Sequence, residues 1–109
     1  MKKYCLALDL IDKPEMIAAY EAYHKAVWPE IIASIKNAGI AEMEIYRTGN
    51  RLFMTIEAAD DFSFEKKTAM DAADSKVQEW EKLMWTYQQA LPGAGPGEKW
   101  VLMDKIFSL

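Results

Sequence analysis

Four stretches of the chain have the residue pattern of β-strands. Residues 4–10 alternate between apolar residues on one side and small or polar residues on the other, which is typical of a half-buried strand. Residues 40–48 and 51–58 are predicted as a second and a third strand, and residues 100–107 as the last one. Gly49-Asn50 between the second and third is a favourable two-residue hairpin turn. These two strands are therefore expected to pair directly.

The first helical region lies between residues 12 and 39, where apolar residues recur at spacings of three and four. We predict Asp12 as its cap, with Pro14 in the first turn and Glu15 reaching back. Pro29 limits how far a straight helix can run, because it lacks a backbone donor. A second helical piece follows Pro29 and is expected to end at Gly39, since glycine can adopt the left-handed closing conformation.

The second helical region follows Asp60-Asp61. Its apolar residues again recur at three and four: Met70, Ala73, Val77, Trp80 and Met84. Asp74 is placed to cap a new helix at Ser75, and residues 92–97 read as a surface loop. The order βαββαβ predicts an α+β, ferredoxin-like domain over residues 1–109, with a four-stranded antiparallel sheet against helices on one face.

The predicted strands are apolar on both sides. Phe53 lies opposite Leu52 and Met54 in the alternation, and Ile106 lies opposite Phe107. A sheet with one solvent-exposed face should show a stricter alternation of apolar and polar residues. We therefore expect the second face to pack on another copy of the chain, giving a homodimer of the dimeric α/β-barrel type.

Charge and composition exclude several classes of function. The net charge of −4 leaves no basic stripe for nucleic acid. Cys5 is the only cysteine, which excludes an internal disulfide and fits a reducing compartment. Asp9 and Asp12 interrupt the apolar start of the chain, so it is not expected to act as a secretory signal. No stretch is long enough for a membrane span. We expect a soluble cytoplasmic domain.

His24 is the only histidine and the first candidate for chemistry. Tyr20 precedes it by one helical turn and Trp28 follows it by one, so the three side chains share a helix face. An imidazole titrates near neutral pH, which suits general acid/base catalysis. A histidine buried in the core is the alternative interpretation. No second histidine is present for a metal site, and no Cys-His or Ser-His-Asp spacing indicates a nucleophile.

Other aromatic and acidic residues allow more than one interpretation. Tyr23, Tyr46 and Trp80 can line a pocket, but aromatic residues at helical spacing also fit a core. Glu81 can accept hydrogen bonds from ligand hydroxyls or simply face water. The same choice applies to the strand glutamates Glu42, Glu44 and Glu57. No phosphate loop or dinucleotide fingerprint is present.

The run Tyr20-x-x-x-His24-x-x-x-Trp28-Pro29-Glu30 resembles the L-rhamnose mutarotases. The similarity continues over nearly the whole chain, at Gly39, Ile45-Tyr46, Asn50-Arg51-Leu52-Phe53, Val77-Gln78-Glu79-Trp80, Leu91-Pro92 and Ile106-Phe107-Ser108-Leu109. This resemblance implies a cytoplasmic homodimer of ferredoxin-like subunits. It also implies the interconversion of the α and β anomers of a 6-deoxy-hexopyranose without a cofactor or a metal.

The resemblance also implies roles for individual residues. His24 would be the general acid/base, with Tyr20 and Trp80 contacting the sugar. Two positions depart from the family pattern: the family often has a tyrosine where this chain has Met43, and a second tryptophan where it has Glu81. The missing aromatic ring at Met43 and the additional carboxylate at Glu81 change how the pocket binds the hydroxyls of a sugar. This makes L-fucose an alternative to L-rhamnose. The full set of expected substrate-binding residues is Tyr20, Trp28, Met43, Tyr46, Trp80 and Glu81.

Two other functions remain open from the sequence. A small cofactor-free oxygenase of the dimeric α/β-barrel type would share the strand order and the aromatic cavity. A non-catalytic ligand-binding barrel would use His24 only to orient a ligand. Measurable turnover of a sugar would distinguish a mutarotase from the oxygenase and from the binding barrel.

Overall fold

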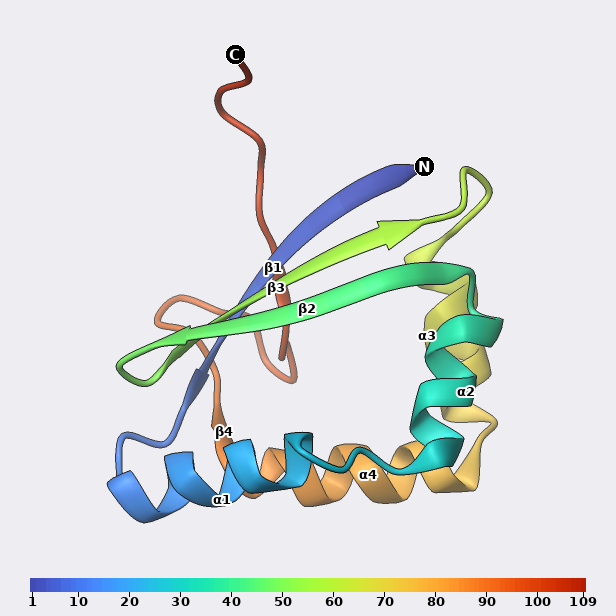
Figure 1. Ribbon diagram of the computed structural model, residues 1–109. Coiled ribbons are helices and arrows are strands. Elements are labelled where there is room, and N and C mark those ends of the chain that lie inside the picture. The colour runs from blue at the N-terminus through green and yellow to red at the C-terminus, as the bar shows by residue number, and fades with distance from the viewer.

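Five strands form one antiparallel sheet in the computed structural model, which describes residues 1–109 (Figure 1). The strands are β1 (Lys2–Leu10), β2 (Ile40–Thr48), β3 (Arg51–Ala58), β4 (Gln88–Gln89) and β5 (Val101–Leu102). The order is β2-β3-β1-β4, and β5 also pairs with β1. The helices are α1 (Pro14–His24), α2 (Pro29–Asn37), α3 (Phe64–Ala72) and α4 (Ser75–Trp85). The helices lie on one side of the sheet, where α4 packs against both α2 and α3. The predicted α+β, ferredoxin-like arrangement is confirmed.

Local sequence signals account for most of the turns and helix ends. Gly49 and Gly39 have positive φ angles of 57° and 96°, so the predicted hairpin turn and helix end are both confirmed. Asp74 caps α4 by accepting hydrogen bonds from the backbone N–H of Lys76 and Val77, at 3.0 and 3.3 Å.

The predicted cap at Asp12 is wrong. Lys13 is the residue that precedes α1, in an extended conformation and without a side-chain capping bond. Pro14 does occupy the first turn, as predicted. Its fixed φ angle and its missing N–H suit that position, so the helix can begin there without a polar cap.

The last part of the chain differs from the prediction. Only Val101–Leu102 of the predicted strand 100–107 pairs with β1, and the backbone N–H of Met103 donates one further bond of 2.8 Å to the Cys5 carbonyl. The predicted strand count of four is also wrong, because Gln88–Gln89 pairs with the end of β1. The sheet is open, so one chain alone does not close into a barrel.

The inner face of the sheet carries the core. Leu8 and Leu10 of β1 and Leu52 of β3 are fully buried. One cluster of buried side chains gathers towards α1 and α4: Leu10, Tyr20, Ile31, Leu52, Val77, Trp80 and Met84. A second cluster lies at the other end of the sheet: Leu6, Ile40, Met54, Ile56, Ala58 and Phe62. Partly buried residues such as Ile35, Ile45 and Trp100 pack against both.

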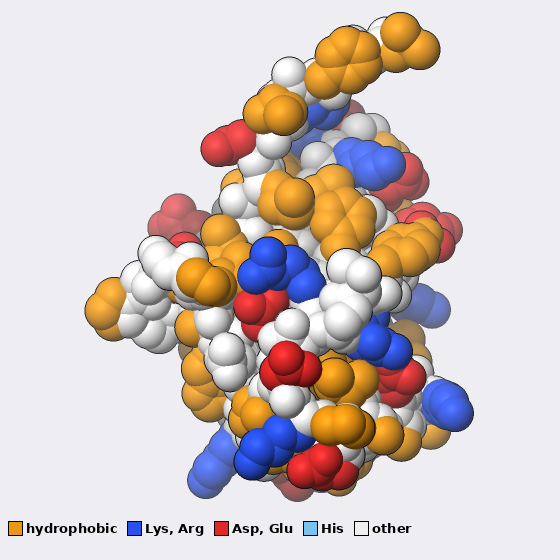
Figure 2. Space-filling model, turned by 90° about the vertical axis from the view of Figure 1, so that its left-hand side faces the viewer, with side chains coloured by type: hydrophobic (Ala, Val, Ile, Leu, Met, Phe, Trp, Pro, Cys, Tyr) orange, Lys and Arg blue, Asp and Glu red, His pale blue; other side chains and the backbone are white.

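The outer face of the sheet is partly apolar and has no helix over it. Phe53 of β3 pairs in register with Tyr46 of β2, whose side chain is 54% exposed. The last residues of the chain project beyond the sheet (Figures 1 and 2), and Ile106 and Phe107 are 95% and 75% exposed. None of the helices has the length and apolar character needed to cross a bilayer.

Candidate active site

A cavity of about 340 Å³ lies between the inner face of the sheet and the helices. Fourteen of its 22 lining residues are hydrophobic, so most of its wall favours an apolar surface of a ligand. Its other lining residues carry polar or charged side chains: His24, Ser34, Lys67, Thr68, Asp71, Glu81, Gln88 and Lys99. This volume is near the lower end of the range for ligand pockets, roughly 300–1,000 Å³. The cavity suits a small ligand with both apolar and polar groups.

His24 is held by the helix that carries it. It is the last residue of α1, and its Nδ1 lies 2.8 Å from the backbone carbonyl oxygen of Tyr20, one turn earlier. A carbonyl oxygen can only accept, so Nδ1 carries the proton in this bond. In the neutral imidazole, Nε2 is then the basic nitrogen. The fold therefore fixes both the orientation and the tautomer of the only histidine.

Tyr20 lies directly against His24. Their ring centroids are 4.3 Å apart, and Tyr20 is almost completely buried. Its hydroxyl accepts a hydrogen bond of 3.3 Å from Gln88 Nε2. Burial raises the pKa of Tyr20, and the bond from Gln88 offsets only part of this effect. The phenol therefore keeps its proton at neutral pH and can donate it in a hydrogen bond into the cavity.

Trp80 forms the aromatic wall beside the histidine. Its ring meets His24 edge to face, with centroids 5.7 Å apart. Trp28 packs on Trp80 at 5.0 Å, and the ammonium group of Lys76 lies 5.7 Å from the centre of the Trp28 ring. Trp28 does not line the cavity. In this position its ring packs against that of Trp80.

The cavity includes most, but not all, of the residues that the sequence indicated. It brings together Tyr20, His24, Met43, Trp80 and Glu81. It includes neither Trp28 nor Tyr46, which were also expected to bind the sugar.

Tyr46 is absent from the cavity because side chains alternate along β2. Ile45 points inward and lines the cavity, whereas Tyr46 points to the outer face. There its ring lies 6.4 Å from that of Phe53, and its hydroxyl donates to Glu44 at 3.3 Å.

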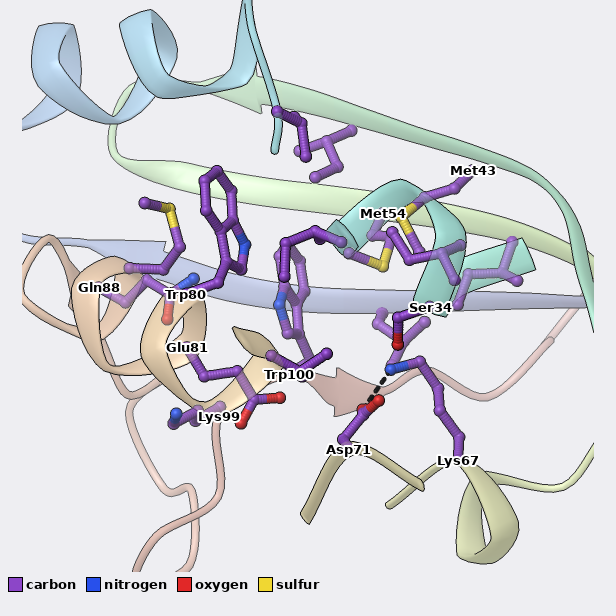
Figure 3. Close-up of a pocket in the computed structure, with 18 of the residues that line it drawn as sticks. Ser34, Met43, Met54, Lys67, Asp71, Trp80, Glu81, Gln88, Lys99 and Trp100 are labelled. Atoms are coloured by element: carbon purple, nitrogen blue, oxygen red, sulfur yellow. Dashed lines mark hydrogen bonds and ion pairs between the residues drawn. The ribbon is translucent and has the colours of Figure 1, made fainter. Parts of the chain in front are cut away.

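Several lining residues had no signal in the sequence. Gln88 lies in the unpredicted strand β4, and Trp100 was assigned only to the last strand. Lys67 and Asp71 are one turn apart on α3 and form an ion pair of 2.5 Å at the cavity wall (Figure 3). Isolated polar residues of this kind become recognisable only when the tertiary structure brings them to one cavity. No group of three His, Cys, Asp or Glu side chains is arranged as metal ligands would be.

Known proteins show to which family the chain belongs. Residues 3–109 match the L-rhamnose mutarotase family. This chain belongs to that family. The L-fucose mutarotase of Xanthomonas campestris pv. campestris is 49% identical over 111 residues, which cover 100% of this chain and 89% of that protein. The resemblance inferred from the Tyr20–Glu30 run is therefore confirmed.

Solved structures share the fold of this mutarotase family member. The crystal structure of an L-rhamnose mutarotase from Formosa agariphila has a TM-score of 0.73 and 21% identity, covering 100% of this chain and 99% of that one. Tetracenomycin F2 cyclase from Streptomyces glaucescens has a TM-score of 0.66 and 18% identity, covering 100% and 97%. The fold alone thus occurs with different chemistries, and the function has to be argued from the site.

Proposed function

We propose that this protein interconverts the α and β anomers of a 6-deoxy-hexopyranose, with L-fucose as the preferred sugar. The observation that carries this proposal is the fixed imidazole of His24. Its Nδ1–H is bound to the Tyr20 carbonyl, and the ring lies between Tyr20 and Trp80 beside a small cavity. An imidazole held in one tautomer can take and return a proton through Nε2.

The reaction needs only proton transfers and one bond rotation. His24 Nε2 takes the proton of the anomeric hydroxyl while the ring oxygen receives a proton from a second donor. The bond between the anomeric carbon and the ring oxygen then breaks. The aldehyde rotates, and the same steps in reverse close the ring on its other face. We assign the role of second donor to Tyr20, because its buried hydroxyl is protonated at neutral pH. Glu81, which also lines the cavity, is the alternative for the second polar group that assists the reaction.

The lining of the cavity suits a 6-deoxy sugar. Such a sugar has a methyl group where an ordinary hexose has a hydroxymethyl group. Met43, Met54 and Ile56 form an apolar surface on the sheet that can receive this methyl group without leaving a hydroxyl unpaired. The name of the Xanthomonas relative favours L-fucose over L-rhamnose. The same relatives favour a mutarotase over an oxygenase or a non-catalytic binding barrel.

We further propose that the protein works as a cytoplasmic homodimer that pairs through the outer face of the sheet. Phe53 and the exposed Tyr46 form an apolar patch there, with no helix of the same chain covering them. The exposed Ile106 and Phe107 extend from the edge of the same sheet. Burying this surface against a second copy would remove it from water, which favours association.

Anomer exchange measured by proton NMR saturation transfer tests the proposed reaction. L-fucose and L-rhamnose should be measured in parallel, with wild-type protein and with His24→Ala. We expect catalysed exchange, faster on L-fucose, that is lost in the variant. Absence of exchange on both sugars would overturn the proposed function, and faster exchange on L-rhamnose would overturn the choice of sugar.

A further inference from the structure

The Lys67–Asp71 pair is a charged feature of the cavity that the reaction itself does not use. Both residues lie on α3 and line the cavity, and their side chains are only 24% and 11% exposed. Figure 3 shows the pair across the cavity from Trp80 and Gln88, with Trp100 between the two ends. His24 packs against Trp80, so the pair lies away from the proposed acid/base group.

The hydrogen bonding of the pair within the protein is incomplete. Lys67 Nζ donates to Asp71 Oδ2, whereas Asp71 Oδ1 accepts no hydrogen bond from the protein. An ammonium group has three donors, and a carboxylate oxygen can accept more than one bond. Charged groups at a largely apolar wall are costly unless their remaining bonds are supplied. A ligand that offers a donor and an acceptor side by side would supply them.

The position of Asp71 is fixed from outside the cavity. Gln78 on α4 donates a hydrogen bond of 2.8 Å from its side-chain amide to the backbone carbonyl of Asp71. This bond ties the end of α3 to α4, the helix that carries Trp80 and Glu81. The carboxylate is therefore held at a constant place relative to the aromatic wall, which a selective contact requires.

We propose that Lys67 and Asp71 determine which sugar is accepted, by binding the 3- and 4-hydroxyls of the pyranose. Asp71 Oδ1 accepts from the 4-hydroxyl, and Lys67 Nζ donates to the neighbouring 3-hydroxyl. The anomeric carbon faces His24 at the other end of the cavity. In L-fucose the 3- and 4-hydroxyls are cis, whereas in L-rhamnose they are trans. A carboxylate and ammonium pair fixed at one spacing therefore favours the cis diol. This inference rests on the proposed function, because it takes the ligand to be a 6-deoxy-hexopyranose.

Binding to deoxy sugars tests this contact independently of catalysis. The probes are L-fucose, 2-deoxy-L-fucose and 4-deoxy-L-fucose, titrated against tryptophan fluorescence, since Trp80 and Trp100 line the cavity. Asp71→Asn should weaken binding of L-fucose and 2-deoxy-L-fucose by about ten- to a hundredfold, the loss expected for a hydrogen bond to a charged group. It should leave the binding of 4-deoxy-L-fucose at the wild-type level, because that sugar lacks the contacted hydroxyl.

Two further variants separate recognition from a merely structural ion pair. Glu79→Gln removes one partner of the exposed Lys76–Glu79 pair on α4, outside the cavity, and should bind all three sugars like wild type. The double variant Lys67→Met with Asp71→Leu removes both charges together, so no unpaired charge is left to unfold the protein. It should weaken L-fucose binding at least as much as Asp71→Asn does, because it removes both contacts.

Each outcome bears on the contact or on the proposed reaction separately. Equal weakening of all three sugars by Asp71→Asn, or no weakening of any, would overturn the contact while leaving anomer exchange in place. Wild-type binding that depends on Asp71, without anomer exchange, would overturn the mutarotase reaction and retain the contact. Failure of all three sugars to bind the wild-type protein would overturn both.

Discussion

The imidazole of His24 donates a hydrogen bond to the backbone carbonyl of Tyr20, one turn back on the same helix. Because both ends of this bond belong to α1, the orientation of the ring does not depend on a loop or on a distant strand. The side chain of Tyr20 in turn stacks on the ring that its own backbone holds. Two neighbouring turns of one helix therefore supply both proposed proton-transfer groups.

Replacing His24 with alanine should abolish most catalysis and leave the fold intact. General acid/base groups typically contribute about 10²–10⁴-fold to a rate, so we expect a loss of this size in L-fucose anomer exchange. His24 is half-buried at the end of its helix, so the unfolding transition should stay cooperative. Lys25→Ala is the matched control, because Lys25 is the next residue, is exposed and lies outside the cavity. Full exchange by a folded His24→Ala protein would contradict the assignment.

Replacing Tyr20 with phenylalanine should change how stability depends on alkaline pH. The pKa of Tyr20 is raised in the folded protein by burial, above its ordinary value of 10.0. Above pH 10 the unfolded chain loses this proton first, so the free energy of unfolding falls as pH rises towards the folded pKa. The contribution of one such proton is at most about 1.4 kcal/mol per pH unit.

Urea unfolding of wild type and Tyr20→Phe at pH 8, 9.5 and 11 measures this effect. The variant should lose stability less steeply above pH 10. Part of the loss of stability with rising pH should remain in the variant, because the pKa of Tyr87 is also raised. The larger cause is desolvation, and the smaller one is its neighbour Tyr23. At pH 8 the variant should be less stable by about 1 kcal/mol, since Gln88 loses its partner. If the free energy of unfolding fell equally steeply with pH in the two proteins, the pKa of the Tyr20 phenol would not be raised in the folded protein.

Glu81 should contribute to the balance between sugars, beside the Lys67–Asp71 pair. Glu81→Gln removes the charge but keeps the shape, and we expect about a tenfold loss of L-fucose exchange for a lost charge-assisted bond. Glu81→Trp restores the residue that resemblance to the family implies, and it should raise the ratio of L-rhamnose to L-fucose exchange. Saturation transfer on both sugars measures the ratio. An unchanged ratio in both variants would remove Glu81 from sugar recognition.

Placing a charge on the outer face of the sheet should separate the proposed dimer. Phe53→Lys puts an ammonium group beside Tyr46, and desolvating it in an interface would be costly. We expect light scattering coupled to gel filtration to give the mass of two chains for wild type and of one chain for the variant. Ala18→Lys adds the same charge at an exposed position of α1 and should stay dimeric. A monomeric wild type at micromolar concentration would contradict the proposal.

The parts of the fold that follow from short-range sequence signals were predictable. Gly39 and Gly49 have the positive φ angles that glycine accommodates best, and Asp74 caps the helix that starts after it. Pairing between strands that are far apart in the sequence was harder to predict. β4 has only two residues, and no alternation can be recognised in Gln88–Gln89. The apolar pattern of residues 100–107 indicated a strand, but only Val101–Leu102 pairs with β1, and Ile106 and Phe107 are exposed.

The candidate site was predictable where it lies on one helix. Tyr20 and His24 share a face of α1, so their spacing alone was sufficient. Tyr46 lies outside the cavity because successive residues of a strand point to opposite faces of the sheet, and Ile45 points to the inner face. Asp71 and Gln88 reach the cavity through packing between elements distant in the chain, which no local pattern encodes.

The bond from the His24 Nδ1–H to the Tyr20 carbonyl leaves Nε2 as the one ring nitrogen that can meet a sugar. In the proposed reaction this single nitrogen removes the anomeric proton and later returns it, so each turnover leaves the protein in the protonation state in which it began. Such a catalyst needs no recharging step between one sugar molecule and the next.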